Sequence, residues 1–195
     1  MRGWLIGMAL VFAGAAVADD LPVAPPSPLI DPYGGKPLRT PPEIGRFALG
    51  NATGKILATR LDQVKAAVGS GATQGVAGTP FNYLCYDLPA AKQRVWLSST
   101  DGAVDAVTVK MLDGSDPVSK SCPELPARFG PVVVDGKVRL NMSKAELVSL
   151  FGQPSIAAGN WLAFHGITSH GLTTVTVRLA QDKAVFLYAA YDDVE

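Results

Sequence analysis

The chain carries one pattern of residues twice. The sequence Asn-Tyr-Leu-Cys-Tyr-Asp at residues 82–87 reappears as Asn-Trp-Leu-Ala-Phe-His at residues 160–165, 78 residues later. Each copy follows a helix-like segment that stops at a glycine, Gly69 or Gly152, and precedes two runs of β-forming residues. Self-similarity at a spacing of about 80 residues indicates one duplicated supersecondary unit, whose two sheets can join.

Each repeat is expected to begin with a short helix. In the first, Thr59 is followed three positions later by Asp62, which resembles a capping box, and in the second Ser143 and Glu146 form the complete motif. The two glycines end these helices because glycine adopts the left-handed conformation of a helix end without steric cost. Helices this short are marginal alone and must be held by packing on a sheet.

Alternating β-forming residues predict three strands after each helix. The expected ranges are residues 82–86, 93–98 and 104–111, then 160–165, 173–179 and 184–191. Asp135-Gly136 also predicts a hairpin in which residues 131–134 pair with residues 137–140. The fold class we expect is α+β: two tandem helix–β–β–β repeats that form one antiparallel sheet, with both helices on one face and the other face open.

The first 18 residues resemble a secretory signal peptide. Arg2 precedes an apolar run at residues 4–17, and Ala16-Val17-Ala18 forms an A-x-A cleavage site. The run of about 14 residues is shorter than the ~20 that span a bilayer, which argues against a membrane anchor. We expect cleavage after Ala18, a periplasmic or secreted mature protein, and no transmembrane segment in that mature chain.

The rest of the chain divides by composition. Residues 19–42 hold eight of the 15 prolines, and because proline cannot donate to a strand ladder, we expect a semi-stiff linker there. Residues 43–112 form the first repeat, residues 113–131 a polar connector and residues 132–195 the second repeat. The roughly 150 residues of the two repeats are the length of one domain.

Charge and cysteine content narrow the classes of partner. Lys plus Arg and Asp plus Glu both number 17, and no basic run exists to bind phosphates, which argues against nucleic acid. In an exported protein, Cys85 and Cys122 are expected to form a disulfide. The alternative, a reactive thiol or metal pair, lacks C-x-x-C spacing. A disulfide that closes this loop of about 37 residues would stabilise the fold by roughly 3.5–4 kcal/mol, because it lowers the conformational entropy of the unfolded chain.

Strand alternation divides the strand residues between two faces. The aliphatic set, which includes Val95, Val107, Val175 and Leu187, is expected under the helices. The other face mixes aromatic, basic and hydroxyl side chains, as binding surfaces do. The alternative is that these residues only form stabilising cross-strand pairs. The candidate binding residues are Tyr83, Arg94, Trp96, Lys110, Trp161, His165, Arg178, Phe186 and Tyr188.

No motif indicates catalysis, a metal or a cofactor. His165 and His170 are the two histidines, and no third ligand has a spacing that joins them in a metal site. There is no G-x-S-x-G and no G-x-G-x-x-G after a strand. We therefore expect a protein that is not an enzyme and has no metal or cofactor.

One motif suggests a family. The capped second helix, Leu-Phe-Gly-Gln-Pro at residues 150–154, and the aromatic strand at residues 161–164 resemble the SmpA/OmlA-type repeat of small outer-membrane assembly lipoproteins. Two such units over residues 46–191 resemble the β-lactamase inhibitor protein family, whose concave sheet surface grips an enzyme. The lipidated N-terminal cysteine of the assembly lipoproteins is absent, and no motif matches the residues that contact β-lactamase.

The function we expect is an exported, non-catalytic protein-binding module, such as an enzyme inhibitor, that acts through the open sheet face on an enzyme or envelope protein. A cell-envelope assembly or scaffold factor, with the proline-rich segment as a tether, is the first alternative. A hydrolase with an unrecognised site is the second. The oligomeric state stays open.

Overall fold

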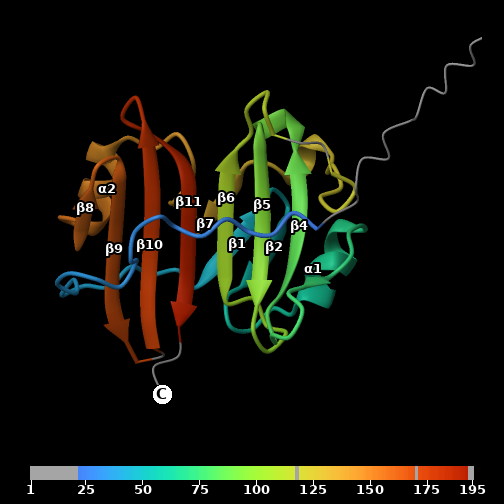
Figure 1. The fold of residues 1–195 in the computed structure, drawn as a ribbon, viewed down its shortest axis with the longest axis horizontal. Helices are drawn as coiled ribbons and strands as arrows, with labels where there is room; N and C mark the ends of the chain where they lie inside the picture. The colour runs from blue at the N-terminus through green and yellow to red at the C-terminus, as the bar shows by residue number, and fades with distance from the viewer. Residues whose placement is uncertain (1–21, 117–118, 170, 193–195) are drawn as a thin grey trace, which may run out of the picture.

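The computed structural model describes residues 22–116, 119–169 and 171–192. The expected signal peptide, its cleavage site and His170 lie outside the described residues. An eight-stranded antiparallel sheet dominates the described part, in the order β3-β4-β5-β6-β11-β10-β9-β8 (Figure 1). Its strands are β3 (Gln74–Gly75), β4 (Asn82–Leu88), β5 (Gln93–Ser99), β6 (Ala106–Met111), β8 (Ile156–Ala158), β9 (Trp161–Thr168), β10 (Gly171–Ala180) and β11 (Lys183–Asp192).

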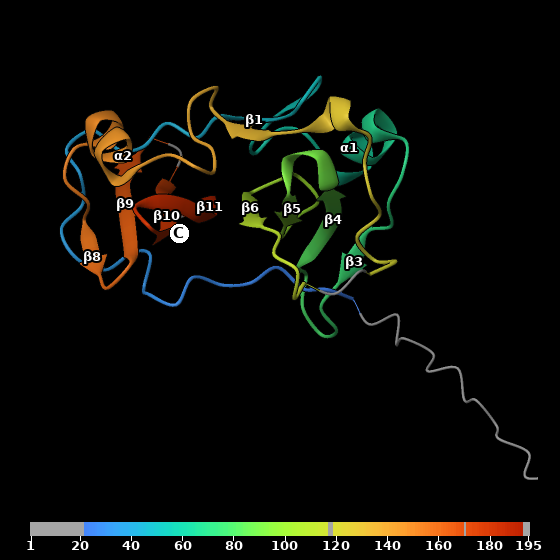
Figure 2. The ribbon, with the colours of Figure 1, turned by 90° about the horizontal axis from the view of Figure 1, so that it is seen from above.

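A second layer covers one face of this sheet. Figure 2 shows the helices and β1 on the same side of it. The layer contains a three-stranded sheet in the order β2-β1-β7, helices α1 and α2, and short 3-10 turns. The bounds are β1 (Arg46–Leu49), β2 (Ala52–Lys55), β7 (Val132–Val134), α1 (Leu61–Val68), α2 (Lys144–Phe151), η1 (Pro89–Ala91) and η2 (Ala127–Phe129).

The predicted fold class is therefore wrong. The protein is mainly β, with two sheets, and not a pair of helix–β repeats that form one sheet. The physical reason is coverage: a helix of eight residues is about 12 Å long, whereas eight strands spaced about 4.8 Å apart span more than 30 Å. Two such helices cannot bury one face, and β1, β2 and β7 cover the rest of it.

The small sheet also changes the expected hairpin. Asp135 and Gly136 do form a tight turn, with φ of 50° and 69°, and Val134 bridges Val138. The main partner of β7 is nevertheless β1, where Phe47 pairs with Val134 and Leu49 with Val132. The strand after Asp135-Gly136 does not extend to residue 140.

The two helix starts differ from each other. For α2 the predicted capping box is confirmed: Ser143 Oγ accepts from Glu146 N at 3.2 Å, and Glu146 Oε2 accepts from Ser143 N at 2.7 Å. For α1 the N-cap is Arg60 and not Thr59, because Gln63 Oε1 accepts the Arg60 N–H. The Thr59 hydroxyl instead accepts from Lys55 N.

The main core lies between the large sheet and the second layer. As alternation predicts, the aliphatic residues of the six central strands point into it. The buried members include Leu84, Val95, Leu97, Val107, Val109, Leu162, Phe164, Val175, Val177 and Leu187 from the sheet, and Phe47, Leu49, Leu61, Val64, Val132 and Leu147 from the second layer.

The opposite face of the large sheet is crossed by residues 22–34, which we call the strap. Its blue trace runs across β4, β5, β6, β11 and β10 in Figure 1, and Figure 2 places it on the side away from the helices. The chain then reaches the edge of β9, where Leu38 N donates to the His165 carbonyl at 2.8 Å.

Candidate functional site

The face beneath the strap, which we call the strap face, consists of three cross-strand rows. The strand register places every predicted binding residue in one of these rows, so they do share a face. The first row is Asp87, Arg94, Lys110, Phe186, Arg178 and Trp161. The second is Cys85, Trp96, Thr108, Tyr188, Thr176 and Ala163, and the third is Tyr83, Ser98, Ala106, Ala190, Thr174 and His165.

The expectation that this face is open is wrong. Trp96 is 2 % exposed and Trp161 8 %. The strap covers the middle of the face (Figure 1). Of the nine predicted residues, six are buried, namely Tyr83, Arg94, Trp96, Trp161, His165 and Phe186, and three are half-buried, namely Lys110, Arg178 and Tyr188.

Side chains of the sheet hold the strap through its backbone. Trp96 Nε1 donates to the Val23 carbonyl at 2.8 Å, and Thr174 Oγ1 donates to the Pro32 carbonyl at 3.3 Å. Val23 N donates to Ser121 Oγ at 3.2 Å. The strap thus accepts one hydrogen bond near each end, from Trp96 and from Thr174, and it donates a third to Ser121 in the loop after β6. Residues 22–34 lie on the sheet and do not extend from it as the expected linker would.

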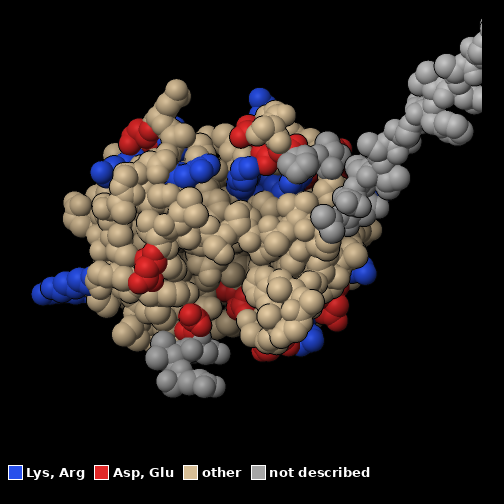
Figure 3. Space-filling view, viewed as in Figure 1, with Lys and Arg blue, Asp and Glu red and all other residues tan. Residues whose placement is uncertain are grey.

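The charged side chains of the first row are engaged within the chain. Figure 3 shows Lys and Arg side chains across the upper part of this face, above a mostly uncharged band. Arg94 donates from Nε and Nη2 to the two carboxylate oxygens of Asp87 at 2.6 and 2.8 Å. These hydrogen bonds raise the pKa of the Arg94 guanidinium. Lys110 pairs with Asp116.

The two aromatic residues of the first row pack against each other. The Trp161 and Phe186 rings meet edge to face at 5.3 Å, and the Arg178 guanidinium lies 6.0 Å from the centre of the Trp161 ring. Both contacts are internal to the sheet. The pairing that we expected with a partner is therefore made within the chain.

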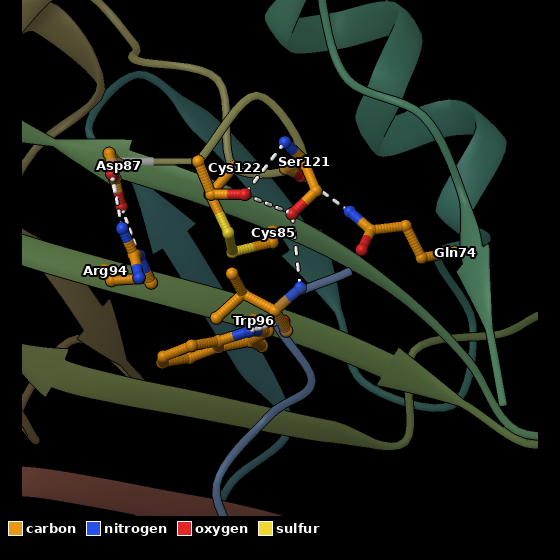
Figure 4. Close-up of a disulfide and its surroundings, with 9 residues drawn as sticks. Gln74, Cys85, Asp87, Arg94, Trp96, Ser121 and Cys122 are labelled. Carbon is orange, nitrogen blue, oxygen red and sulfur yellow. Dashed lines mark hydrogen bonds and ion pairs between the residues drawn. A yellow bond between two sulfur atoms is a disulfide. The ribbon is translucent and has the colours of Figure 1, made fainter. Parts of the chain in front are cut away.

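The predicted disulfide is present and supports one end of the strap. Cys85 and Cys122 are bonded, with their Cα atoms 4.6 Å apart (Figure 4). The bond holds the loop containing Ser121 over β4, beside Trp96. Tyr83, Cys85, Trp96 and Cys122 form a small core of their own, against which Val23 of the strap packs.

His165 lies buried at the other end of the strap face. His165 is 1 % exposed, and its Nδ1 atom has no hydrogen-bond partner among the described residues. Burial lowers the pKa of the imidazole, and the Asp31 carboxylate in the strap opposes that shift in part. Neutral His165 therefore fits the folded protein better than its cation does.

We expect the protein to lose stability as the pH falls through about 6.5, the ordinary pKa of an unfolded imidazole. The unfolded imidazole binds a proton that the folded one resists, so acid favours unfolding around this pH. Thermal melts at a series of pH values measure the effect. His165→Gln should flatten the profile, because it removes the buried group and keeps His170. Equal slopes for both proteins would contradict this interpretation.

Neither a metal site nor a membrane helix is found in the described part of the chain. Among the residues that the structure describes, no group of three or more His, Cys, Asp or Glu side chains is placed to hold a metal ion. No helix in the described ranges has the length and apolar character that crossing a membrane requires.

Sequence reasoning missed the strap and the residues that contact it. The predicted binding residues include neither Thr174, which holds the Pro32 carbonyl, nor Val23 and Tyr33 of the strap. A signal was present, because Val23, Ile30 and Tyr33 are interleaved with the prolines of an extended segment.

Comparison of the chain with protein-family models, with curated proteins and with solved structures gave no match.

Proposed function

We propose that this protein is an exported, non-catalytic protein-binding module that accepts an extended segment of another polypeptide on the strap face. The observation that carries the proposal is the pair of hydrogen bonds from Trp96 and Thr174 to strap carbonyls. Side-chain donors that hold backbone carbonyls, beside aromatic rings, are how several domains recognise proline-rich extended peptides. The strap occupies this site within the same chain.

The chemistry of the strap face suits such a ligand. Proline-rich segments are already extended, so their binding costs less conformational entropy. The second and third rows contain hydroxyl and aromatic side chains and no Lys, Arg, Asp or Glu, so they place little demand on the side chains of the incoming segment. The Cys85–Cys122 disulfide supports export, since such bonds persist in oxidising compartments.

Cutting the connection between the strap and the sheet tests the proposal. A specific protease site inserted between Lys36 and Pro37, both exposed, lets the whole mature chain fold before the cut. The strap peptide should then leave on dilution and rebind in a saturable way, which the fluorescence anisotropy of a dye-labelled strap peptide can follow. The uncut protein is the control, and it should bind added strap peptide far more weakly, because the attached strap competes at an effective concentration of about millimolar.

A conservative variant assigns the binding to the strap face. Trp96→Phe keeps an aromatic ring but removes the donor to Val23, and it should weaken rebinding about 5- to 10-fold, the value of one hydrogen bond. A cut strap that never dissociates, or a protein that unfolds on cutting, would show that residues 22–34 are an integral part of the fold and would overturn the proposal.

A further inference from the structure

A cavity of about 540 Å³ lies between the strap and the sheet. Its strap side is formed by prolines of residues 25–28 and by Tyr33, and its sheet side includes Thr108, Tyr188, Asp105 and Asp192. This volume is in the range of ~300–1,000 Å³ that small-molecule sites occupy. The cavity is therefore large enough for a ligand while the strap stays in place.

The charged groups of the cavity are all acidic. Among the described residues that line it there is no Lys, Arg or His. Asp105 Oδ2 accepts from the amide and the hydroxyl of Thr100, each at 2.8 Å, so its partners there are neutral. Burial raises the pKa of Asp105, and the hydrogen bonds from Thr100 oppose that shift in part. Because no described cationic side chain lines the cavity, a cation bound there would meet these acidic groups without competition.

Two tyrosines complete the site. The Tyr33 hydroxyl of the strap interacts with Tyr188 and with Asp192 on β11, and burial together with these neighbours raises the pKa of Tyr33. Burial likewise raises the pKa of Tyr188. Both phenols therefore stay neutral, and they offer aromatic surface and hydroxyl oxygens, both of which attract cations.

We infer that this cavity binds an organic cation, an ammonium or guanidinium group, between the strap prolines, the two tyrosines and the carboxylates of Asp105 and Asp192. Hard divalent ions fit the cavity less well, because they need about six oxygen ligands, and no group of three metal-ligating acidic or histidine side chains occurs in the described ranges. The apolar prolines suit the alkyl part of an organic cation.

This inference depends on the strap being in place, and it does not depend on peptide binding. If the cut strap fails to exchange, the cavity is a permanent feature and the site stands. If the strap does exchange, a cation that bridges Tyr33 and Asp105 favours the covered state and should slow release of the strap.

The experiment titrates the intact mature protein with choline and with its neutral isostere, 3,3-dimethylbutanol, by calorimetry. Choline should bind in a saturable way, and the isostere should bind at least about 10-fold more weakly, since about 1.4 kcal/mol of electrostatic attraction is lost. Nα-acetyl-lysine amide, titrated in parallel, distinguishes a free amine from a basic side chain of a polypeptide as the natural source.

Matched variants place the binding in the cavity. Asp105→Asn keeps the acceptor for Thr100 and should raise the choline Kd about 10-fold, whereas Asp101→Asn, on the exposed turn of the same loop, should change it less than about 2-fold. Near-ultraviolet circular dichroism checks that each variant is folded. Equal binding of choline and the isostere, or a folded Asp105→Asn protein with an unchanged Kd, would overturn the inference.

Discussion

Replacing Arg94 with methionine is expected to lower the free energy of unfolding by about 3–5 kcal/mol, the usual cost of removing one partner of a buried ion pair. The Arg94 and Asp87 side chains are 3 % and 9 % exposed, and two hydrogen bonds join them. Methionine fills much of the same volume, so the loss comes from a carboxylate left buried without its partner. Urea unfolding followed by fluorescence measures it.

Two further variants identify the cause of this loss. Arg139→Met removes an exposed arginine and should change stability by less than about 0.5 kcal/mol. The double variant Asp87→Leu with Arg94→Met removes both charges and should recover much of the loss, because no unpaired charge then remains. If the double variant is as unstable as the sum of its single variants, the lost packing and not the ion pair determines the effect.

Replacing Cys85 and Cys122 with alanine should lower the free energy of unfolding by about 3.5–4 kcal/mol, as the chain-entropy model gives for a loop of this length. The sequence separation is 37 residues. The change should also loosen one end of the strap, since the disulfide holds Ser121, which accepts the Val23 amide. Denaturant unfolding measures the first effect, and limited proteolysis near residue 23 measures the second.

Reduction of the unmodified protein provides the comparison. With dithiothreitol present, the wild-type protein should unfold at nearly the same denaturant concentration as the double alanine variant, while the variant itself should not respond to the reductant. A reduced wild-type protein as stable as the oxidised form, with an equally protected strap, would show that the loop is held by packing alone.

The strands and their faces could be predicted because both depend on local geometry. Side chains alternate across a strand with a period of two, so Val95 and Leu97 had to face away from Arg94 and Trp96 whatever their partners were. The register confirms that assignment for β4, β5 and β6. The disulfide was also accessible from sequence, since it depended on compartment and on a single available pair.

The segments that cover the two faces of the large sheet could not be predicted in the same way. Pairing of β1 with β7 joins residues about 85 positions apart, and nothing in either short run specifies its partner. The strap lacks periodicity because its prolines form no ladder, so composition alone indicated a linker. Its attachment depends on Trp96 and Thr174, whose donors need carbonyls that only the folded chain brings to them.

The ends of the large sheet have a consequence for self-association. The outermost strands, β3 and β8, contain two and three residues, and the exposed parts of the next strands are bonded by loops: Leu38 donates to His165, and Leu125 to Asp87. Among the described residues, neither border of the large sheet presents a long row of unpaired amides on which a second molecule could build a fibre. The large sheet is therefore a poor template for edge-to-edge polymerisation. A binding partner has to contact its face and not its borders.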